Sequence, residues 1–199
     1  MQNNAYYIQM KRILFIISPF CIILMISLLN NTKRKVTALS TGSNTVKNTV
    51  DDVINWFLSQ DSMSPKKLQK LLYYAYSWDL IFNNDEVDEL NQRLFSNEFE
   101  AWVHGPVIPR IWRRYKDTGS SLIDKNDGNF DGLFDEDTLD TLVQVWDEYG
   151  SYNGNQLESI THQESPWKNA RQGYLPLDRC NVRISDEDIF ECYIQRITV

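Results

Sequence analysis

The sequence predicts a mainly α-helical fold: a single compact multi-helix domain with at most a short extended segment, preceded by a hydrophobic N-terminal segment. Apolar residues recur at helical spacing after residue 50, and serine or proline signals mark several helix starts. The composition supports a folded core, because 42% of the 199 residues are apolar and six are Trp. We therefore divide the chain into an N-terminal segment, residues 1–49, and a domain, residues 50–199.

The N-terminal segment contains a long apolar run. No charged residue lies between 13 and 32, and as a helix the run Ile13–Leu29 would span about 25 Å, slightly less than the roughly 30 Å of a bilayer's hydrocarbon core. Two interpretations stay open: a transmembrane anchor whose basic flank at 33–35 keeps the domain in the cytoplasm, or an upstream start assignment, with translation beginning at Val46 or Val50. A secretory signal is a weaker alternative, because no small-residue cleavage site follows. Both favoured interpretations make the domain cytoplasmic.

The first two helices of the domain follow from apolar spacing and one clear start signal. Ser64 can cap a helix in which Pro65 occupies the first position and which runs to about Phe82. A shorter helix precedes it and stops at 59–62, with its apolar side formed by Val50, Val53, Ile54, Phe57 and Leu58. The apolar side of the longer helix is formed by Leu68, Leu71, Leu72, Ala75 and Leu80. On or beside its opposite side, where we expect a solvated surface rather than an anion site, lie Lys66, Lys67 and Lys70.

An extended stretch and a basic helix come next. The residues at 83–85 break the second helix, and alternation at Phe99, Ala101 and Val103 favours a short strand within 94–103. Gly105 and Pro106 predict a turn. A helix then begins at Pro109 and ends at 117–119, with Ile111, Trp112 and Tyr115 expected to face the core. Its basic residues, interpreted as a solvated face with an acidic partner surface as the alternative, are Arg110, Arg113, Arg114 and Lys116.

The polar loop at 124–137 allows two interpretations. Its residues at 127, 129, 131, 132 and 135 occupy positions 1, 3, 5, 6 and 9 of a calcium-binding loop. Position 12 is Thr138 instead of the bidentate Glu, so tight calcium binding would lose its principal ligand. We favour the alternative, in which the acidic residues stabilise the positive start of the next helix.

Four helices complete the predicted domain. The first ends at Gly150 and has an apolar side formed by Leu139, Leu142, Val143, Trp146 and Tyr149. A short helix is expected at 156–161, and Ser165 with Pro166 starts another that closes by 173–176. Ser185 and Asp188 predict a capping box for the last helix, with Ile184 and Ile189 as its hydrophobic staple.

Charge and cysteine content limit the classes of function. Residues 50–199 hold 14 basic and 27 acidic residues, so their net charge is −13. A domain this acidic repels phosphate, which argues against DNA or RNA as the main partner and favours a basic or amphipathic protein. Cys21, Cys180 and Cys192 have no metal-ligand spacing and are interpreted as idle thiols in a reducing compartment, while a Cys180–Cys192 bridge stays open.

Two histidines are the strongest candidates for chemistry. His104 and His162, together with Glu100, Glu164 or Thr161, offer the minimum ligand set of a catalytic zinc site or an acid/base pair. Neither imidazole has a second His or Cys three or four positions away, so the spacing is not diagnostic. We favour a structural role, in which each imidazole bonds backbone at a tight turn beside a packed Trp. A metal-dependent hydrolase using these residues is the alternative.

Three motifs occur in a fixed order: KLQKLLYYA at 67–75, WVHGPV at 102–107 and THQESPW at 161–167. In these motifs the chain resembles the Panacea domain family, which includes SocA-like antitoxins and phage-associated GepA-like proteins. The resemblance covers the chain from about residue 50 onward. It implies a helical, non-catalytic antitoxin without a cofactor that neutralises a cognate toxin, encoded by an adjacent gene, through direct protein–protein binding. Some members resemble SocA, a proteolytic adaptor that delivers its toxin to a protease.

The resemblance also marks the residues expected to form a structural and partner-binding centre. These motif positions are Lys67, Gln69, Lys70, Tyr73, Trp102, His104, Gly105, Pro106, Thr161, His162, Glu164, Pro166 and Trp167. Because the domain is acidic, we expect a basic surface on the toxin, since complementary charge raises the association rate. Nucleic acid is not expected as a partner, and a membrane is expected only if the N-terminal apolar run is a genuine anchor.

Overall fold

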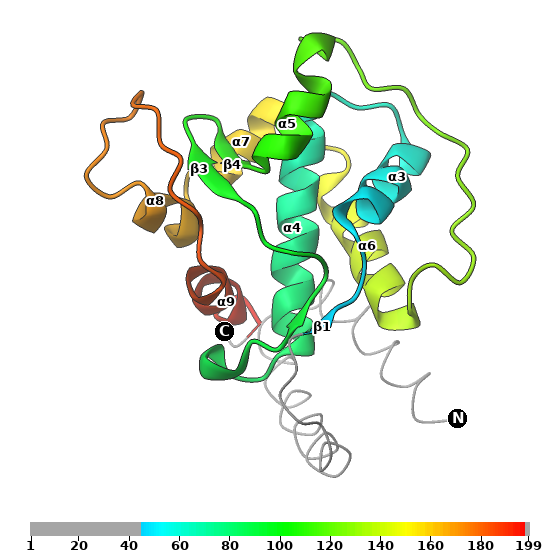
Figure 1. The fold of residues 1–199 in the computed structure, drawn as a ribbon, viewed down its shortest axis with the longest axis horizontal. Coiled ribbons are helices and arrows are strands. Elements are labelled where there is room, and N and C mark those ends of the chain that lie inside the picture. Colours follow the sequence, from blue (N-terminus) through cyan, green and yellow to red (C-terminus); the bar gives the residue numbers. More distant parts are fainter. Residues whose placement is uncertain (1–44, 198–199) are drawn as a thin grey trace.

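The computed structural model describes residues 45–197, in which helices surround one central helix (Figure 1). The α-helices of this part are α3 (Val50–Gln60), α4 (Pro65–Asn83), α5 (Pro109–Tyr115), α6 (Glu136–Tyr149), α7 (Gly154–Thr161), α8 (Ser165–Ala170) and α9 (Asp186–Ile194). Two 3-10 turns lie at Val87–Glu89 and Lys116–Thr118. The predicted mainly α-helical domain with short extended segments is confirmed.

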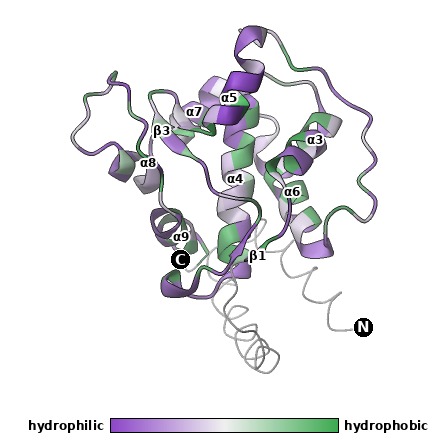
Figure 2. Cartoon of the chain, in the orientation of Figure 1, coloured by the Kyte–Doolittle hydropathy of each residue, from purple (hydrophilic) through white to green (hydrophobic). Residues whose placement is uncertain are grey.

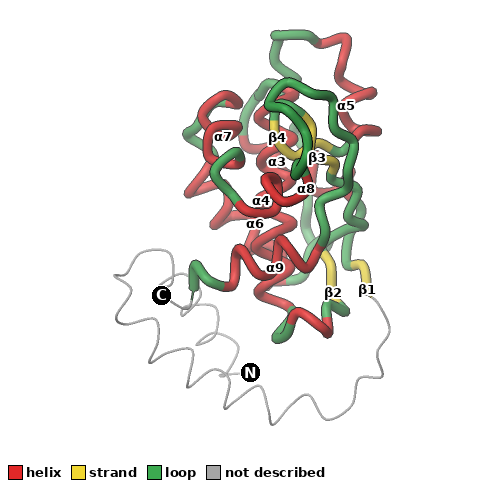
Figure 3. The backbone as a smooth tube through the Cα atoms, turned by 90° about the vertical axis from the view of Figure 1, so that its left-hand side faces the viewer, coloured by secondary structure: helices red, strands yellow, loops and turns green. Residues whose placement is uncertain are grey.

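Helix α4 is the axis of the domain. Ser64 accepts a hydrogen bond from the Lys67 amide and Pro65 occupies the first helical position, as predicted. Every residue from Leu68 to Ile81 is buried, so neighbours cover this helix on all sides. In Figures 1 and 3, α5, α7 and the strands β3 and β4 lie at its N-terminal end, whereas α9 and the strands β1 and β2 lie toward its C-terminal end.

The short strands form two separate pairs (Figure 3). Strand β1 (Thr45–Val46) runs parallel to β2 (Gln92–Arg93), and β3 (Glu100–Trp102) runs antiparallel to β4 (Gly105–Val107). The strand expected within 94–103 is therefore present. The turn expected at Gly105 and Pro106 lies two residues earlier, at Val103 and His104, because Gly105 takes a φ of 88° and returns the chain directly into β4.

Hydrophobic and hydrophilic residues alternate along α3 and α6 in Figure 2, as expected of helices with one buried side. Two residues predicted to be buried are nevertheless exposed: Trp112 (42%) on α5 and Leu139 (40%) on α6. Successive residues point about 100° apart on a helix, so the side of α5 that buries Ile111 leaves Trp112 partly uncovered. On α6 the buried face passes through Thr138, Leu142 and Val145, which turns Leu139 outward.

Local signals placed most helix ends correctly. Asp135 accepts a hydrogen bond from the Thr138 amide at the start of α6, which confirms the acidic helix entry for the 124–137 loop. Ser185 accepts from the Asp188 amide at the start of α9, with Ile184 and Ile189 fully buried. Gly150 is the C-cap of α6, as expected.

The start of α8 differs from the prediction at its cap residue. Ser165 is the first residue of α8, and Glu164 stands at the cap position without a side-chain hydrogen bond to the helix, so the predicted serine cap is wrong. The Glu164 carboxylate bonds Arg196 and Tyr193 instead.

Cys180 and Cys192 are free thiols, so the bridge between them that the sequence left open is not formed.

The folded unit includes residues before the predicted boundary at 50. Thr45 and Val46 pair with β2, and Lys47 Nζ lies 3.6 Å from Oδ1 of the buried Asp79. Thr49 forms a capping box with Asp52 at the start of α3. The apolar run at 13–29 lies outside the described residues; across 45–197, no helix combines the length and apolar character needed to cross a membrane.

Candidate functional site

Two polar side chains of α4 attach the β3–β4 hairpin to the N-terminal end of this helix. The Gln69 amide nitrogen donates to the Ile108 carbonyl at 3.2 Å, and the Ile108 amide donates to Gln69 Oε1 at 2.9 Å. At the next residue of α4, Lys70 Nζ donates to the Pro106 carbonyl at 2.9 Å. These long-range bonds satisfy backbone groups just after the hairpin turn, so the first and second motifs form one structural unit.

Lys70 is not on a solvated surface, contrary to the sequence prediction. The residue is 1% exposed, because the hairpin folds over this turn of α4. Burial lowers the pKa of Lys70 to about 7, while Glu158 raises it and Lys66 lowers it further. Lys66 and Lys67 are half-buried: Lys66 Nζ lies 2.6 Å from Glu158 Oε2, and Lys67 Nζ donates to the Gly150 carbonyl at 2.6 Å.

Gly105 lets the hairpin approach Lys70 and the third motif closely. A Cβ atom at this position would lie 2.8 Å from Thr161 Oγ1 and 2.9 Å from Lys70 Nζ. Thr161 is fully buried and donates its hydroxyl to the Glu158 carbonyl at 2.9 Å. The glycine is therefore required both by its positive φ and by the space, which joins all three motifs at one point.

The two histidines flank this point in different environments. His104 has a 68% exposed side chain, and its Nδ1 lies 2.8 Å from Glu158 Oε1, so the predicted bond to backbone is wrong for this residue. His162 stacks on Trp167, with ring centroids 4.0 Å apart. Burial lowers the pKa of His162, Glu158 raises it, and nearby Lys70 lowers it.

The two motif tryptophans tie the hairpin to α8. Trp167 Nε1 donates to the Trp102 carbonyl at 2.9 Å, and Trp102 Nε1 donates to Glu100 Oε2 at 2.7 Å. Both indoles are partly buried. Their packing agrees with the structural role predicted for the residues around each histidine, and the Trp102 indole bonds Glu100, one of the carboxylates named in the zinc hypothesis.

Tyr73, Glu164 and Pro166 do not join the hairpin centre. Tyr73 belongs to a second group, the aromatic cluster, in which rings meet edge to face; its members are Tyr73, Trp78, Phe99 and Tyr193. Glu164, 4% exposed, accepts from Arg196 at 2.9 Å and from the Tyr193 hydroxyl at 3.1 Å. Burial raises the pKa of Glu164, and Arg196 opposes this. Pro166 is buried in the first turn of α8.

No three His, Cys, Asp or Glu side chains gather to hold a metal ion within the part of the chain that the structure describes. The carboxylate beside His104 is Glu158, whereas Glu100 and Glu164 have other partners. The ligand set on which the metal-dependent hydrolase depended is therefore not assembled. The same finding applies to the calcium-like spacing at 127–138.

A groove lies beside the hairpin, and sequence reasoning missed part of it. This hairpin groove, about 190 Å³, runs between the N-terminal end of α4, the hairpin and α5; its lining includes the aromatic residues Trp102, Trp112 and Tyr115 and the lysines Lys66, Lys70 and Lys116. Trp102 and Trp112 meet edge to face at 5.3 Å. Apolar spacing could not assign Trp112 to the groove, because adjacent helical residues are both buried wherever neighbours cover the helix on several sides, as on α4.

A second hollow adjoins the same hairpin turn. It measures about 310 Å³ and is lined by Trp102, Val103, His104, Leu177, Arg179 and Cys180. Leu177 is 85% exposed, and the nearby loop also exposes Tyr174 and Leu175. The hairpin turn is thus flanked by two concave surfaces with exposed apolar side chains, the composition expected of a protein-binding surface.

Comparison with known proteins identifies the family. The family model described as antitoxin SocA-like, Panacea domain, matches residues 68–168, which is half of the chain and includes all three motifs apart from Lys67. No curated protein and no solved structure matches the chain.

Proposed function

Because the chain belongs to the SocA-like antitoxin family with a Panacea domain, we propose that it is the antitoxin of a toxin–antitoxin pair and neutralises its toxin by direct protein–protein binding. The toxin is expected from a gene next to that of the antitoxin, and the contact is expected in the cytoplasm. The family match is the observation that carries this proposal.

The arrangement around the hairpin supports a binding role. The motif side chains Gln69, Lys70 and Trp167 bond the hairpin backbone, which makes the hairpin a rigid platform rather than a mobile loop. Beside that platform Trp112 and Leu177 stay exposed. A preorganised surface with exposed aromatic and aliphatic anchors costs little to order on binding, which favours affinity for a protein partner.

Growth rescue tests the proposal. Cells that express the neighbouring gene should stop growing and should resume growth when the full chain, or the chain from residue 45, is expressed with it. We expect both forms to rescue, because residues 45–49 keep the β1–β2 pair and the cap of α3. Failure of both forms would contradict the antitoxin role.

Two additions separate the possible mechanisms of neutralisation. If the protein occludes the toxin, toxin levels should stay constant during rescue; if it delivers the toxin to a protease, as a proteolytic adaptor does, toxin levels should fall and rescue should require that protease. His104→Ala should change rescue only as far as it changes toxin binding, because this exposed side chain pairs with Glu158 and lines the groove. Loss of rescue with unchanged toxin binding would instead favour an enzymatic role.

A further inference from the structure

We propose that the hairpin groove is the docking site for the toxin and that it receives an acidic segment, with a carboxylate next to a large aromatic or aliphatic side chain. The inference rests on the proposed function and deepens it by naming the contact surface and the chemistry of the partner. It refines the expectation of a basic toxin surface, which came from the net charge of the whole domain.

The first observation is the local charge. Residues 45–197 contain 27 acidic and 15 basic residues, the latter being Lys47 and the 14 that follow residue 50. The hairpin groove and the adjoining hollow nevertheless have no Asp or Glu in their linings, which include Lys66, Lys70, Lys116 and Arg179. An acidic domain therefore has a concave surface whose charged lining is cationic, and such a surface complements carboxylates.

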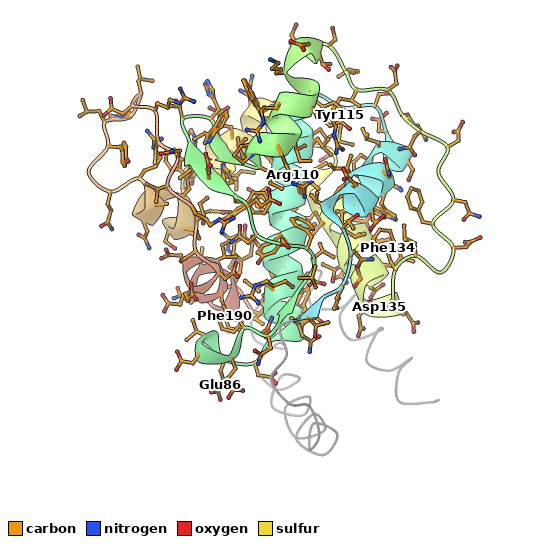
Figure 4. All side chains as sticks on the ribbon, in the orientation of Figure 1. Glu86, Arg110, Tyr115, Phe134, Asp135 and Phe190 are labelled. Atoms are coloured by element: carbon orange, nitrogen blue, oxygen red, sulfur yellow. The ribbon has the colours of Figure 1, made fainter. Side chains whose placement is uncertain are left out.

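The surrounding ion pairs leave part of this positive charge uncompensated. Glu158 pairs with Lys66 and His104 at the edge of the groove. Lys116 and Arg179 form no ion pair with any described residue. In Figure 4, Tyr115, which lines the groove, lies on α5, whereas Glu86 and Asp135 lie toward the opposite end of the domain.

The second observation is the charge of Lys70 beside the groove. The Lys70 ammonium donates to the Pro106 carbonyl and, within the described residues, no ion pair fixes it. Because the residue is 1% exposed, this ammonium would attract a carboxylate held in the groove through its charge rather than through a direct contact. A basic segment would instead place like charges together, which is unfavourable.

The third observation is the apolar wall. Trp112 is 42% exposed although it contacts Trp102, and the lining also contains Val107, Ile111 and Tyr115. Exposed tryptophans beside a concavity are typical centres of protein interfaces. Because the groove has both an apolar wall and lysines, we expect the bound segment of the partner to carry an apolar side chain next to an acidic one.

Binding should depend on pH through Lys70. Its ammonium form predominates below about 7, so a carboxylate should bind less tightly as the pH rises above that value. The other groups that face Lys70 are Lys66 on α4, Glu158 on α7, His104 in the hairpin turn and His162 at the end of α7. The pKa of His162 is lowered from its ordinary value, so this imidazole loses its charge below the pH range in which Lys70 titrates, and a Lys70→Met variant separates the two contributions.

The experiment measures the dissociation constant between the full chain and the purified product of the neighbouring gene by titration calorimetry. Trp112→Glu should weaken binding by about 30-fold or more, as loss of an interface hot spot does, and Lys116→Glu should weaken it by about tenfold. Leu139→Glu is the matched control, because Leu139 is as exposed as Trp112 (40% against 42%) but lies on α6, and it should change the constant less than twofold. Thermal melts confirm that each variant folds.

A photoreactive phenylalanine at position 112 identifies the occupant of the groove. Crosslinking to an acidic stretch of the toxin supports the inference. Crosslinking to a second copy of this chain, to its own N-terminal residues or to a basic stretch of the toxin overturns it. Equal affinities of Trp112→Glu, Lys116→Glu and the native chain would also overturn it, while leaving the antitoxin role intact; absence of any binding by the native chain would remove both proposals.

Discussion

Lys70 on helix α4 and Glu164 at the start of α8 are both buried, and their partners differ. Glu164, at the aromatic cluster, is bonded by the Arg196 guanidinium and the Tyr193 hydroxyl. Lys70, at the hairpin end, bonds one backbone carbonyl and lines a groove. A buried charge that meets an opposite charge stabilises the fold, whereas the ammonium of Lys70 keeps its positive charge beside a groove. The aromatic cluster is therefore filled by the protein's own side chains, and the hairpin end keeps a concave surface.

The largest effect on this comparison should come from Gly105→Ala at the hairpin end. The methyl group would require a positive φ and would crowd Thr161 and Lys70, so we expect a loss of about 3 kcal/mol in the free energy of unfolding. Gly173→Ala is the control, because Gly173 has a φ of 85° with no atom within 4 Å of the added Cβ, and it should lose about 1 kcal/mol. Denaturant titration measures both; equal losses would show that crowding at the hairpin does not matter.

Arg196→Met should have the next largest effect, at the aromatic cluster. It leaves Glu164 buried without its cation, and we expect a loss of about 2 kcal/mol at pH 7, reduced from the usual cost because a third of the Arg196 side chain is exposed. Arg114→Met is the control, since it breaks the exposed pair with Asp51 and should cost less than about 1 kcal/mol.

The pH profile of the same variants checks the role of Glu164. Its pKa is raised in the folded protein, so the native state holds the proton more tightly, and stability falls as the pH rises from about 4.5 through the raised pKa. Arg196→Met should steepen this fall, and Glu164→Gln should remove it. A flat profile for Arg196→Met would contradict the assignment of the buried charge.

Gln69→Leu should have a smaller effect at the hairpin end. It leaves the buried Ile108 amide without its partner, while the Ile108 carbonyl still accepts from the Ile111 and Trp112 amides, and we expect a loss of about 1.5 kcal/mol. The control is Gln163→Leu, which removes one exposed bond to the Ser159 carbonyl and should cost less than about 0.5 kcal/mol. If both variants melt at the same temperature, Gln69 does not hold the hairpin.

Lys70→Met should have the smallest effect at pH 7, because it removes a hydrogen bond but also a buried charge. The folded pKa of about 7 lies below the ordinary value of 10.5, so the unfolded chain holds more protons between these values and native stability rises with pH across that range. The variant should lose this rise. An unchanged slope between pH 7 and 10 would contradict the depressed pKa.

Local signals in the sequence were enough for much of the fold. Ser64 with Pro65 and Ser185 with Asp188 start their helices as expected, because a cap bonds amides only two or three residues away. The same signals failed at Ser165, since the neighbouring Glu164 is held by Arg196, a residue 32 positions distant. Distant partners of this kind leave no periodic pattern in the chain.

The sequence by itself determined the helical fold, most helix ends and the family, because apolar periodicity, capping and the three motifs are all local properties of the chain. Tertiary structure alone decided that Lys70 is buried, that Gly105 meets Thr161, that the motif residues divide between two centres and that Trp112 lines a groove. The physical reason is that burial of a helix side depends on which distant segment covers it. For Lys70 that segment is the hairpin, 36 residues further along the chain.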